Sequence, residues 1–345
     1  MSGRPLKARA PGRVNLIGDH TDYNAGLALP IATDLSTEAL FTPIHSSPTL
    51  LVRSDAEPGA AQIDITTAPD PEELRSSEPR WARNVAGVIA ALRPECGGTV
   101  QISSTLPVGS GMASSAAVEI AVALSLGFEA DPLTLARTCQ RAEQVATGVP
   151  CGLLDQLAIV EAEAGHAILI DFSALSREKI PVPVGAEVVV AHSGESRLLD
   201  RTDYANRRAE CEAASLRLGP LGVLSPGTEK QLHDPLLRRR ARHVISECER
   251  VRNFAAALAQ GDLRSAGSIM NESHVSLARD FEVSTPALDH LVDHLLAMPG
   301  VFGARLTGAG FGGCVVALAE PGAIDTNLVG ARAWRIIPSR GAAVI

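Results

Sequence analysis

The stretch PVGSGMASSAA, residues 107–117, is the most informative part of this 345-residue chain. One apolar run precedes it at 100–106 and another follows at 118–126, which predicts a strand, a glycine-rich loop and the start of a helix. Glycine permits a tight bend because it has no Cβ. The free N–H groups and the dipole at a helix N-terminus favour an anion. The stretch is therefore typical of a phosphate cradle.

Composition limits the classes of protein to which the chain can belong. It is long enough for two domains, and 46% hydrophobic with 20% charged residues is ordinary for a folded globular protein. A formal net charge of -8 gives no electrostatic case for binding nucleic acid or an anionic membrane surface. Lysine occurs only at positions 7, 179 and 230, so an anionic ligand would depend on arginines, a metal or helix termini.

The cysteines and the apolar runs indicate in which cellular compartment the protein is expected. Six cysteines without paired spacing argue against a structural zinc site and a disulfide framework, and we expect a reducing, cytoplasmic environment. The basic start of the chain lacks the apolar core of a secretory signal. No apolar run is long enough to span a bilayer, so we expect no membrane anchor.

Hydrophobic patterns predict a mixed α/β chain. Residues 173–183 have no such pattern and are expected to form a loop. The expected strands are 14–17, 29–40, 50–54, 63–65, 100–106, 167–172, 187–192, 301–306 and 315–319. The expected helices are 81–92, 132–146, one from 153, 201–216, 236–259, 262–280 and 286–297.

Three further stretches carry chemically informative residues. APGRVNLIGDHTDYNAG, residues 10–26, could form an ordinary polar turn or a metal site of Asp, His and Asp, and the residues alone leave both open. CGLLDQ, residues 151–156, places Asp155 in the first turn of a helix, where a carboxylate is common. TGAGFGG, residues 307–313, could be a hairpin bend, but its glycine density at a strand end favours close approach to a ligand.

The order and spacing of these four stretches resemble the GHMP kinase superfamily and, within it, the galactokinase family. The resemblance covers nearly the whole chain. It implies a two-domain α/β fold, with a mixed sheet and helices in residues 1–185, a ferredoxin-like domain in 186–345, and the active site between them. It also implies ATP-dependent phosphorylation of the C1 hydroxyl of galactose, with Mg²⁺ as cofactor. The implied partners are the sugar and ATP, without nucleic acid or membrane, and the protein is expected to be a monomer.

The resemblance also implies a role for individual residues. Asp155 matches the catalytic aspartate and Arg13 the arginine beside it. Near an arginine and a helix N-terminus a carboxylate stays ionised, so Asp155 is a weak base that could orient the sugar hydroxyl as much as deprotonate it. Ser115 and Glu143 match the Mg²⁺ ligands. The sugar-binding positions are matched by Asp19, His20, Asp22, Gly152 and Tyr204. The nucleotide positions are matched by Ser54, Trp81 (as a stacking surface for adenine), Pro107, Gly109, Ser110, Gly111, Met112, Ala113, Ser114 and Ser115. The late glycine turn contributes Gly308, Gly310, Gly312 and Gly313.

Some positions depart from the family pattern. Asp19 replaces the usual glutamate, which shortens its reach to a sugar by about one methylene and could indicate another sugar. Met112-Ala113 replaces Leu-Ser, residues 82–86 differ around the expected base pocket, and the tail after Ala319 is short. The alternatives are therefore another sugar 1-kinase or a catalytically dead regulator that binds sugar and ATP. A dinucleotide-binding fold is excluded because the loop lacks the third glycine, and the P-loop and protein-kinase motifs are absent.

Overall fold

The computed structural model describes residues 4–67, 69–107, 110–195, 201–327 and 332–345. Its largest sheet has six strands in the order β13-β1-β3-β6-β4-β5. The strands are β1 (Leu6–Asn15), β3 (Pro30–Ile44), β4 (Thr49–Ser54), β5 (Ala60–Asp64), β6 (Gly97–Ser104) and β13 (Ala343–Val344). Strands β4 and β6 run parallel and the other pairs are antiparallel, so the predicted mixed sheet is confirmed.

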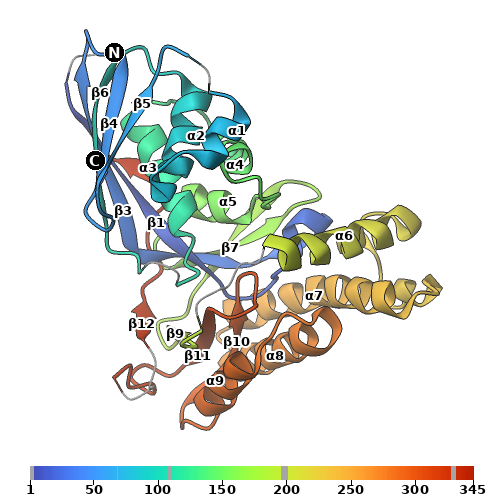
Figure 1. Cartoon of the computed structure of the whole chain (residues 1–345). Coiled ribbons are helices and arrows are strands. Elements are labelled where there is room, and N and C mark those ends of the chain that lie inside the picture. Colours follow the sequence, from blue (N-terminus) through green and yellow to red (C-terminus); the bar gives the residue numbers. More distant parts are fainter. Residues whose placement is uncertain (1–3, 68, 108–109, 196–200, 328–331) are drawn as a thin grey trace.

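Helices cover one face of this sheet (Figure 1). They are α1 (Pro71–Ser76), α2 (Arg83–Leu92), α3 (Ser114–Ser125), α4 (Pro132–Thr147) and α5 (Leu154–Glu161). Helix α3 is buried nearly all round, and its alanines at 116, 117, 121 and 123 let it lie close to β1 and β3. A side-chain cap at Asp131 and Pro132 at the first position start α4, and Gly148 ends it in the left-handed conformation.

A small antiparallel sheet links the two halves of the chain. Its order is β2 (Leu27–Ala28), β7 (His166–Asp171) and β8 (Ser176–Pro181). The expected loop at 173–183 is therefore wrong, because most of it is β8. The strand gave no hydrophobic signal, since Ile180 is its one buried residue and a polar run forms the rest.

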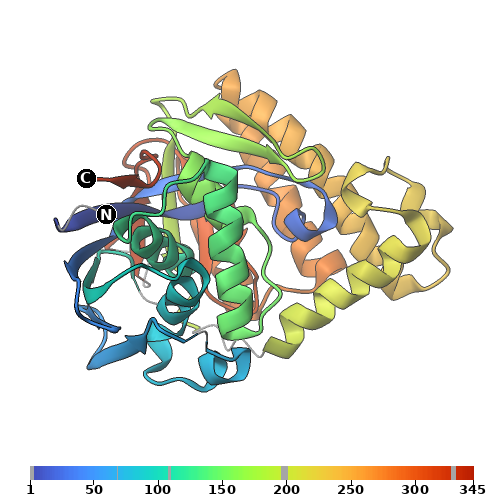
Figure 2. The same cartoon turned by 90° about the horizontal axis from the view of Figure 1, so that it is seen from above.

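The second half builds a four-stranded antiparallel sheet, in the order β10-β11-β9-β12. Its strands are β9 (Glu187–His192), β10 (Val301–Thr307), β11 (Cys314–Ala319) and β12 (Ala333–Ile336). Alternate residues of β9 and β11 join two different buried clusters, so both faces of this sheet are covered. The helices are α6 (Arg201–Leu218), α7 (Pro235–Ala259), α8 (Leu263–Ser276) with a π-helical turn at Leu277–Phe281, and α9 (Pro286–Leu296). Figures 1 and 2 show α6 and α7 projecting away from the sheets.

The end of the chain returns to its beginning. Strand β12 forms an edge of the second sheet, whereas β13 pairs with β1 in the first sheet. Residues 343–344 thus do not follow the expected division at 185/186, which otherwise stays a prediction. Among the described residues no helix is both long and apolar enough to cross a membrane. All six cysteines are free.

Candidate functional site

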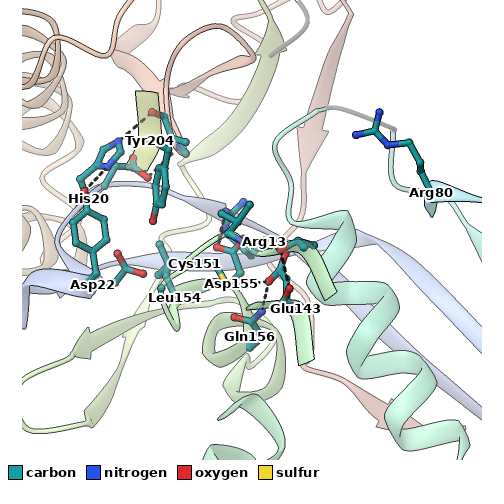
Figure 3. A pocket seen from close by; sticks show the side chains of 17 residues that line it. Arg13, His20, Asp22, Arg80, Glu143, Cys151, Leu154, Asp155, Gln156 and Tyr204 are labelled. Carbon is teal, nitrogen blue, oxygen red and sulfur yellow. Dashed lines mark hydrogen bonds and ion pairs between the residues drawn. The ribbon is translucent and has the colours of Figure 1, made fainter. Parts of the chain in front are cut away.

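A cavity of about 420 Å³ lies between the two halves of the chain, where loop 18–26, the start of α5, helix α6 and the late glycine turn meet (Figure 3). The predicted residues Glu143 and Gly308 line it. The cavity also brings together the complete predicted catalytic and sugar-binding set, namely Arg13, Asp19, His20, Asp22, Gly152, Asp155 and Tyr204.

Arg13 and Asp155 form an ion pair in the cavity wall. Asp155 lies in the first turn of α5, and its Oδ1 accepts from Arg13 Nε at 2.8 Å and lies 2.6 Å from Nη2. The guanidinium also donates to the carbonyl of Gly111, and the Arg13 N–H donates to that of Met112. Gly12 makes this approach possible, because a Cβ there would lie 2.7 Å from the Met112 carbonyl oxygen. One arginine therefore ties Asp155 to the glycine-rich loop.

His20, Tyr23 and Tyr204 line the opposite end of the cavity. The His20 ring lies against Tyr23, Tyr204 and Phe281. Burial lowers the pKa of His20 to about 3, so the ring is neutral at physiological pH. Its Nε2 donates to the carbonyl of Ala309 at 3.1 Å, which leaves Nδ1 to accept from the Tyr23 hydroxyl at 2.9 Å. The ring is thus fixed in one orientation.

Asp22 is a half-buried carboxylate whose place depends on a glycine. A Cβ on Gly152 would lie 1.5 Å from Asp22 Oδ2, so only glycine leaves room for the carboxylate. The backbone N–H groups of Tyr23 and Leu154 donate to it. Burial, together with the nearby charge of Asp155, raises the pKa of Asp22 to about 6. The residue is therefore ionised at neutral pH and titrates in the weakly acidic range.

Asp19 lines the cavity, but both of its carboxylate oxygens already have partners. Oδ2 accepts from Arg305 Nη2 at 2.7 Å and Oδ1 accepts from the Gly308 N–H at 3.1 Å. Burial raises the pKa of Asp19, while the charge of Arg305 opposes the rise. Arg305 is itself fully buried and donates to the Leu16 carbonyl. Asp19 therefore joins loop 18–26 to β10, and its direct contact with a sugar stays a prediction.

Ser115 and Glu143, the predicted metal ligands, are in contact. Ser115 Oγ donates to Glu143 Oε1 at 3.1 Å, and Gln156 Nε2 and the Cys151 thiol donate to Oε2. Burial and the charge of Asp155 raise the pKa of Glu143. Hydroxyl and carboxylate oxygens beside crowded negative charge fit a hard cation. No group of three His, Cys, Asp or Glu side chains in the described part of the chain is arranged for a metal. A cation held by these two protein oxygens would take its remaining ligands from water and phosphate, an arrangement that is common for Mg²⁺ in proteins.

The glycine-rich loop turns between β6 and α3, as predicted. Ser110 donates through its hydroxyl and its N–H to the carbonyl of Pro107, while Gly111 and Ala113 have positive φ. Ala113 provides no side-chain cap, so the first N–H groups of α3, at Ser114 and Ser115, have no capping side chain. This geometry suits an anion. The predicted Gly109 lies outside the described residues.

Several predicted residues lie outside the cavity lining. Ser54 and Trp81 both hold the loop at 55–59, since Ser54 Oγ accepts from the Ala56 N–H and the Trp81 indole donates to the Pro58 carbonyl. Gly310 packs against Val283, where a Cβ would lie 2.4 Å from its carbonyl oxygen. Gly312 and Gly313 have positive φ values of 103° and 88°. They shape the turn, while Gly308 and Ala309 line the cavity.

Sequence reasoning missed other lining residues, among them Arg80, Tyr23, Cys151 and Gln156. Tyr23, Cys151 and Gln156 lie inside the quoted stretches 10–26 and 151–156, so their place in these motifs could have identified them. Arg80 precedes Trp81 directly, and a search for arginines beside the predicted nucleotide residues would have found it.

Comparisons with known proteins match three parts of the chain to family models. Residues 2–43 match the galactokinase galactose-binding signature, residues 83–163 the N-terminal domain of GHMP kinases, and residues 254–326 their C-terminal domain. The chain is 40% identical to the galactokinases of Bos taurus and Homo sapiens, over 92% of its length and 84% of theirs. It is 42% identical to that of Mycobacterium bovis (strain BCG / Pasteur 1173P2), over 90% of its length and 87% of the relative.

Solved structures agree with these matches. The galactokinase of Lactococcus lactis, complexed with galactose, superposes with a TM-score of 0.89 at 30% identity, covering 99% of this chain and 95% of that one. The mevalonate kinase of Methanococcus jannaschii superposes with a TM-score of 0.68 at 20% identity, over 99% of this chain and all of that one, which shows a shared fold.

Proposed function

The chain belongs to the galactokinase family of the GHMP kinases, and on that premise we propose that it transfers the terminal phosphoryl group of ATP to the C1 hydroxyl of galactose. The Arg13–Asp155 ion pair carries this proposal. It stands between two different surroundings, the glycine-rich loop on one side and the buried polar groups around His20 and Asp22 on the other. A phosphate donor and a sugar acceptor would meet at the pair.

The pair suits phosphoryl transfer because that reaction needs positioning more than strong basicity. Its transition state is loose, so the proton of the attacking hydroxyl can leave late. Asp155 accepts the hydrogen bond of the sugar hydroxyl, orients it, and takes its proton as the new bond forms. Arg13 holds the carboxylate in place and offsets the negative charge on the transferred group.

The sugar is held by directional groups around this pair. Asp22 accepts hydrogen bonds from sugar hydroxyls, while the Tyr204 and His20 rings close the wall. Apolar ring faces exclude water from the reacting hydroxyl. Asp19 contributes by fixing the loop and the Gly308 turn, and galactose remains the proposed sugar despite the shorter side chain.

Ser115 and Glu143 would hold Mg²⁺, and their contact at 3.1 Å supports this assignment. When bound, the ion supplies positive charge to the phosphates of the nucleotide. The uncapped N–H groups of α3 add a second source of positive potential. Both are needed because the lysines of the chain, at 7, 179 and 230, are absent from the cavity wall.

We also propose a monomer that acts in the cytoplasm. Free cysteines at all six positions support a reducing compartment. Sedimentation of the purified protein measures the oligomeric state, and a stable dimer would overturn that part of the proposal.

A kinase assay over a panel of sugars tests the reaction. Nuclear magnetic resonance of the product should show phosphate on C1 of galactose. Asp155→Asn keeps the shape of the side chain and should lower kcat by about 10²- to 10⁴-fold while ATP still binds. Transfer to another sugar or hydroxyl would overturn the substrate assignment. If sugar and ATP bind without transfer, the chain is the regulator considered as an alternative.

A further inference from the structure

The π-helical turn at Leu277–Phe281 presents one ring to the loop that lines the cavity. Phe281 is fully buried and is not one of the described residues that form the cavity wall. Its ring centroid lies 4.6 Å from that of His20 and 4.6 Å from that of His243 on α7, at interplanar angles of 40° and 44°. Both distances are typical of interacting aromatic rings. Phe281 therefore packs against the cavity residue His20 from outside the cavity.

His243 reaches the same loop by a second route. Burial lowers the pKa of His243 to about 4, so its ring is neutral, as is that of His20. Its Nε2 donates to the carbonyl of Asp19 at 3.3 Å, and its Nδ1 accepts from the Ser276 hydroxyl at 2.9 Å. Asp19 directly precedes His20. The three rings therefore hold two consecutive residues of loop 18–26, one by its side chain and the other by its backbone.

Arginines from α6 and α7 fix the backbone that carries Phe281. Arg207 Nε donates to the carbonyl of Phe281 at 2.8 Å, and Arg240 Nη1 donates to that of Asp280 at 2.6 Å. Carbonyls at the end of a helix have no partner within the helix, so these arginines satisfy them. Glu282 ends the turn with a left-handed φ of 57° and pairs with Arg240 at 2.6 Å. The ring of Phe281 thus has a rigid base.

The residues after this turn support the other partner of His20. The Phe311 N–H donates to the Val283 carbonyl at 2.8 Å, so the late glycine turn is held against this residue. That turn contains Ala309, whose carbonyl accepts from His20 Nε2 at 3.1 Å. One segment, 277–283, therefore contacts the His20 ring and also supports the carbonyl that fixes its tautomer.

We propose that Phe281 is a positioning residue for galactose binding, which holds the His20 ring in the orientation that the sugar meets. This proposal rests on the proposed function, because it takes His20 as part of the sugar site. An aromatic neighbour favours a defined relative orientation of two rings, which an aliphatic side chain does not impose. Phe281 lies outside the cavity wall, so its effect should fall on the binding of the sugar and not on that of the nucleotide.

Nuclear magnetic resonance of the nitrogen-15-labelled, sugar-free protein tests the link between the two rings. In the wild type the Hε2 proton of His20 should exchange slowly with water, because it is buried and hydrogen-bonded to Ala309. Comparison with His20→Gln assigns the signal. In Phe281→Leu this proton should exchange about 3- to 10-fold faster, the effect that corresponds to the loss of one aromatic pair.

Initial-rate kinetics tests the consequence for the sugar. In Phe281→Leu the KM for galactose should rise by about 3- to 10-fold, while the KM for ATP and kcat stay within about twofold. If Phe281→Leu does not fold, Phe281→Met carries the same two predictions, because it conserves more of the volume and also lacks a flat ring.

Phe254→Leu is the matched control. Phe254 is a fully buried phenylalanine of α7 and, among the described residues, neither lines the cavity nor stacks on His20. The variant should lower the free energy of unfolding by a similar amount, yet leave the His20 signal and the KM for galactose unchanged. An equal change in Phe254→Leu would mean that general loosening of the fold is the cause, which would overturn the proposal.

Two other results would also overturn it. An unchanged His20 signal in Phe281→Leu would mean that Phe281 does not hold the ring, and a changed signal with an unchanged KM for galactose would mean that the orientation does not matter to the sugar. The resonance measurement needs no substrate. A wild type that fails to phosphorylate galactose would therefore overturn the proposed function, while the His20 signal still decides whether Phe281 positions the ring.

Discussion

Gly152→Ala is the sharpest test of how the sugar end is built. The added Cβ would lie 1.5 Å from Asp22 Oδ2 and 2.4 Å from Cγ, whereas ordinary contact begins at 3.4 Å. The carboxylate must therefore move by roughly 2 Å, well beyond the tolerance of a hydrogen bond. It cannot retreat freely, because loop 18–26 is anchored by the Thr21 hydroxyl on the Gly18 and Leu27 carbonyls.

The expected effect follows from the lost hydrogen bonds. A hydrogen bond to a charged group contributes about 1.5–3 kcal/mol, so displacement of Asp22 should raise the KM for galactose by about 10- to 150-fold. The KM for ATP should change less than twofold. Gly152 does not have a positive φ, so alanine adds no backbone strain there and the fold should persist.

Initial-rate kinetics over both substrates measures this split. Gly185→Ala is the control, since a Cβ at Gly185 meets nothing within 4 Å. The double variant Asp22→Ala, Gly152→Ala should be no worse than Asp22→Ala alone, because the clash acts through the carboxylate. A KM for galactose within twofold of the wild type in Gly152→Ala would show that Asp22 does not depend on Gly152 for its place.

Two further predictions concern titration and stability. The pKa of Asp22 is raised to about 6, so the ionised form that accepts hydrogen bonds is lost as the pH falls through 6. The KM for galactose should therefore rise below pH 6 in the wild type and lose this dependence in Asp22→Asn; a flat profile in the wild type would contradict the assignment. Arg305→Met leaves Asp19 buried without its cation and should lower the free energy of unfolding by about 3–5 kcal/mol in urea titration. The partly exposed pair Lys7–Glu38 provides the control, because Lys7→Met should cost no more than about 1 kcal/mol, and equal losses in the two variants would argue against the burial effect.

The sequence predicts the parts of the site that are local in the chain. The glycine-rich loop and the start of α5 are recognisable because glycines, small residues and a helix start follow one another within a few positions. The GHMP kinase fold and the galactokinase family, both expected from these motifs, are confirmed by the comparisons. Which nearby side chains serve which ligand is still a matter for the experiments above.

Pairings between distant residues were not predictable in the same way. Asp19 and Arg305 are 286 positions apart, and the sequence around neither residue indicates that the two side chains pair. The interpretation of Asp19 as a sugar ligand therefore missed its buried ion pair. Strand β8 was missed for a related reason, because its pairing with β7 rests on backbone hydrogen bonds while its side chains are mostly exposed.

The contacts of loop 18–26 also set an order of events during synthesis on the ribosome. Asp19 can form its ion pair and hydrogen bond only after Arg305 and Gly308 have been synthesised, and His20 can bind the carbonyl of Ala309 only after residue 309 has been added. A nascent chain that ends before position 305 can already contain the phosphate loop and the Arg13–Asp155 pair, but the loop that would receive the sugar still lacks its supports. Nearly nine-tenths of the chain must be synthesised before loop 18–26 can form these contacts. Fragments truncated after α9 are therefore expected to lose the sugar half of the site.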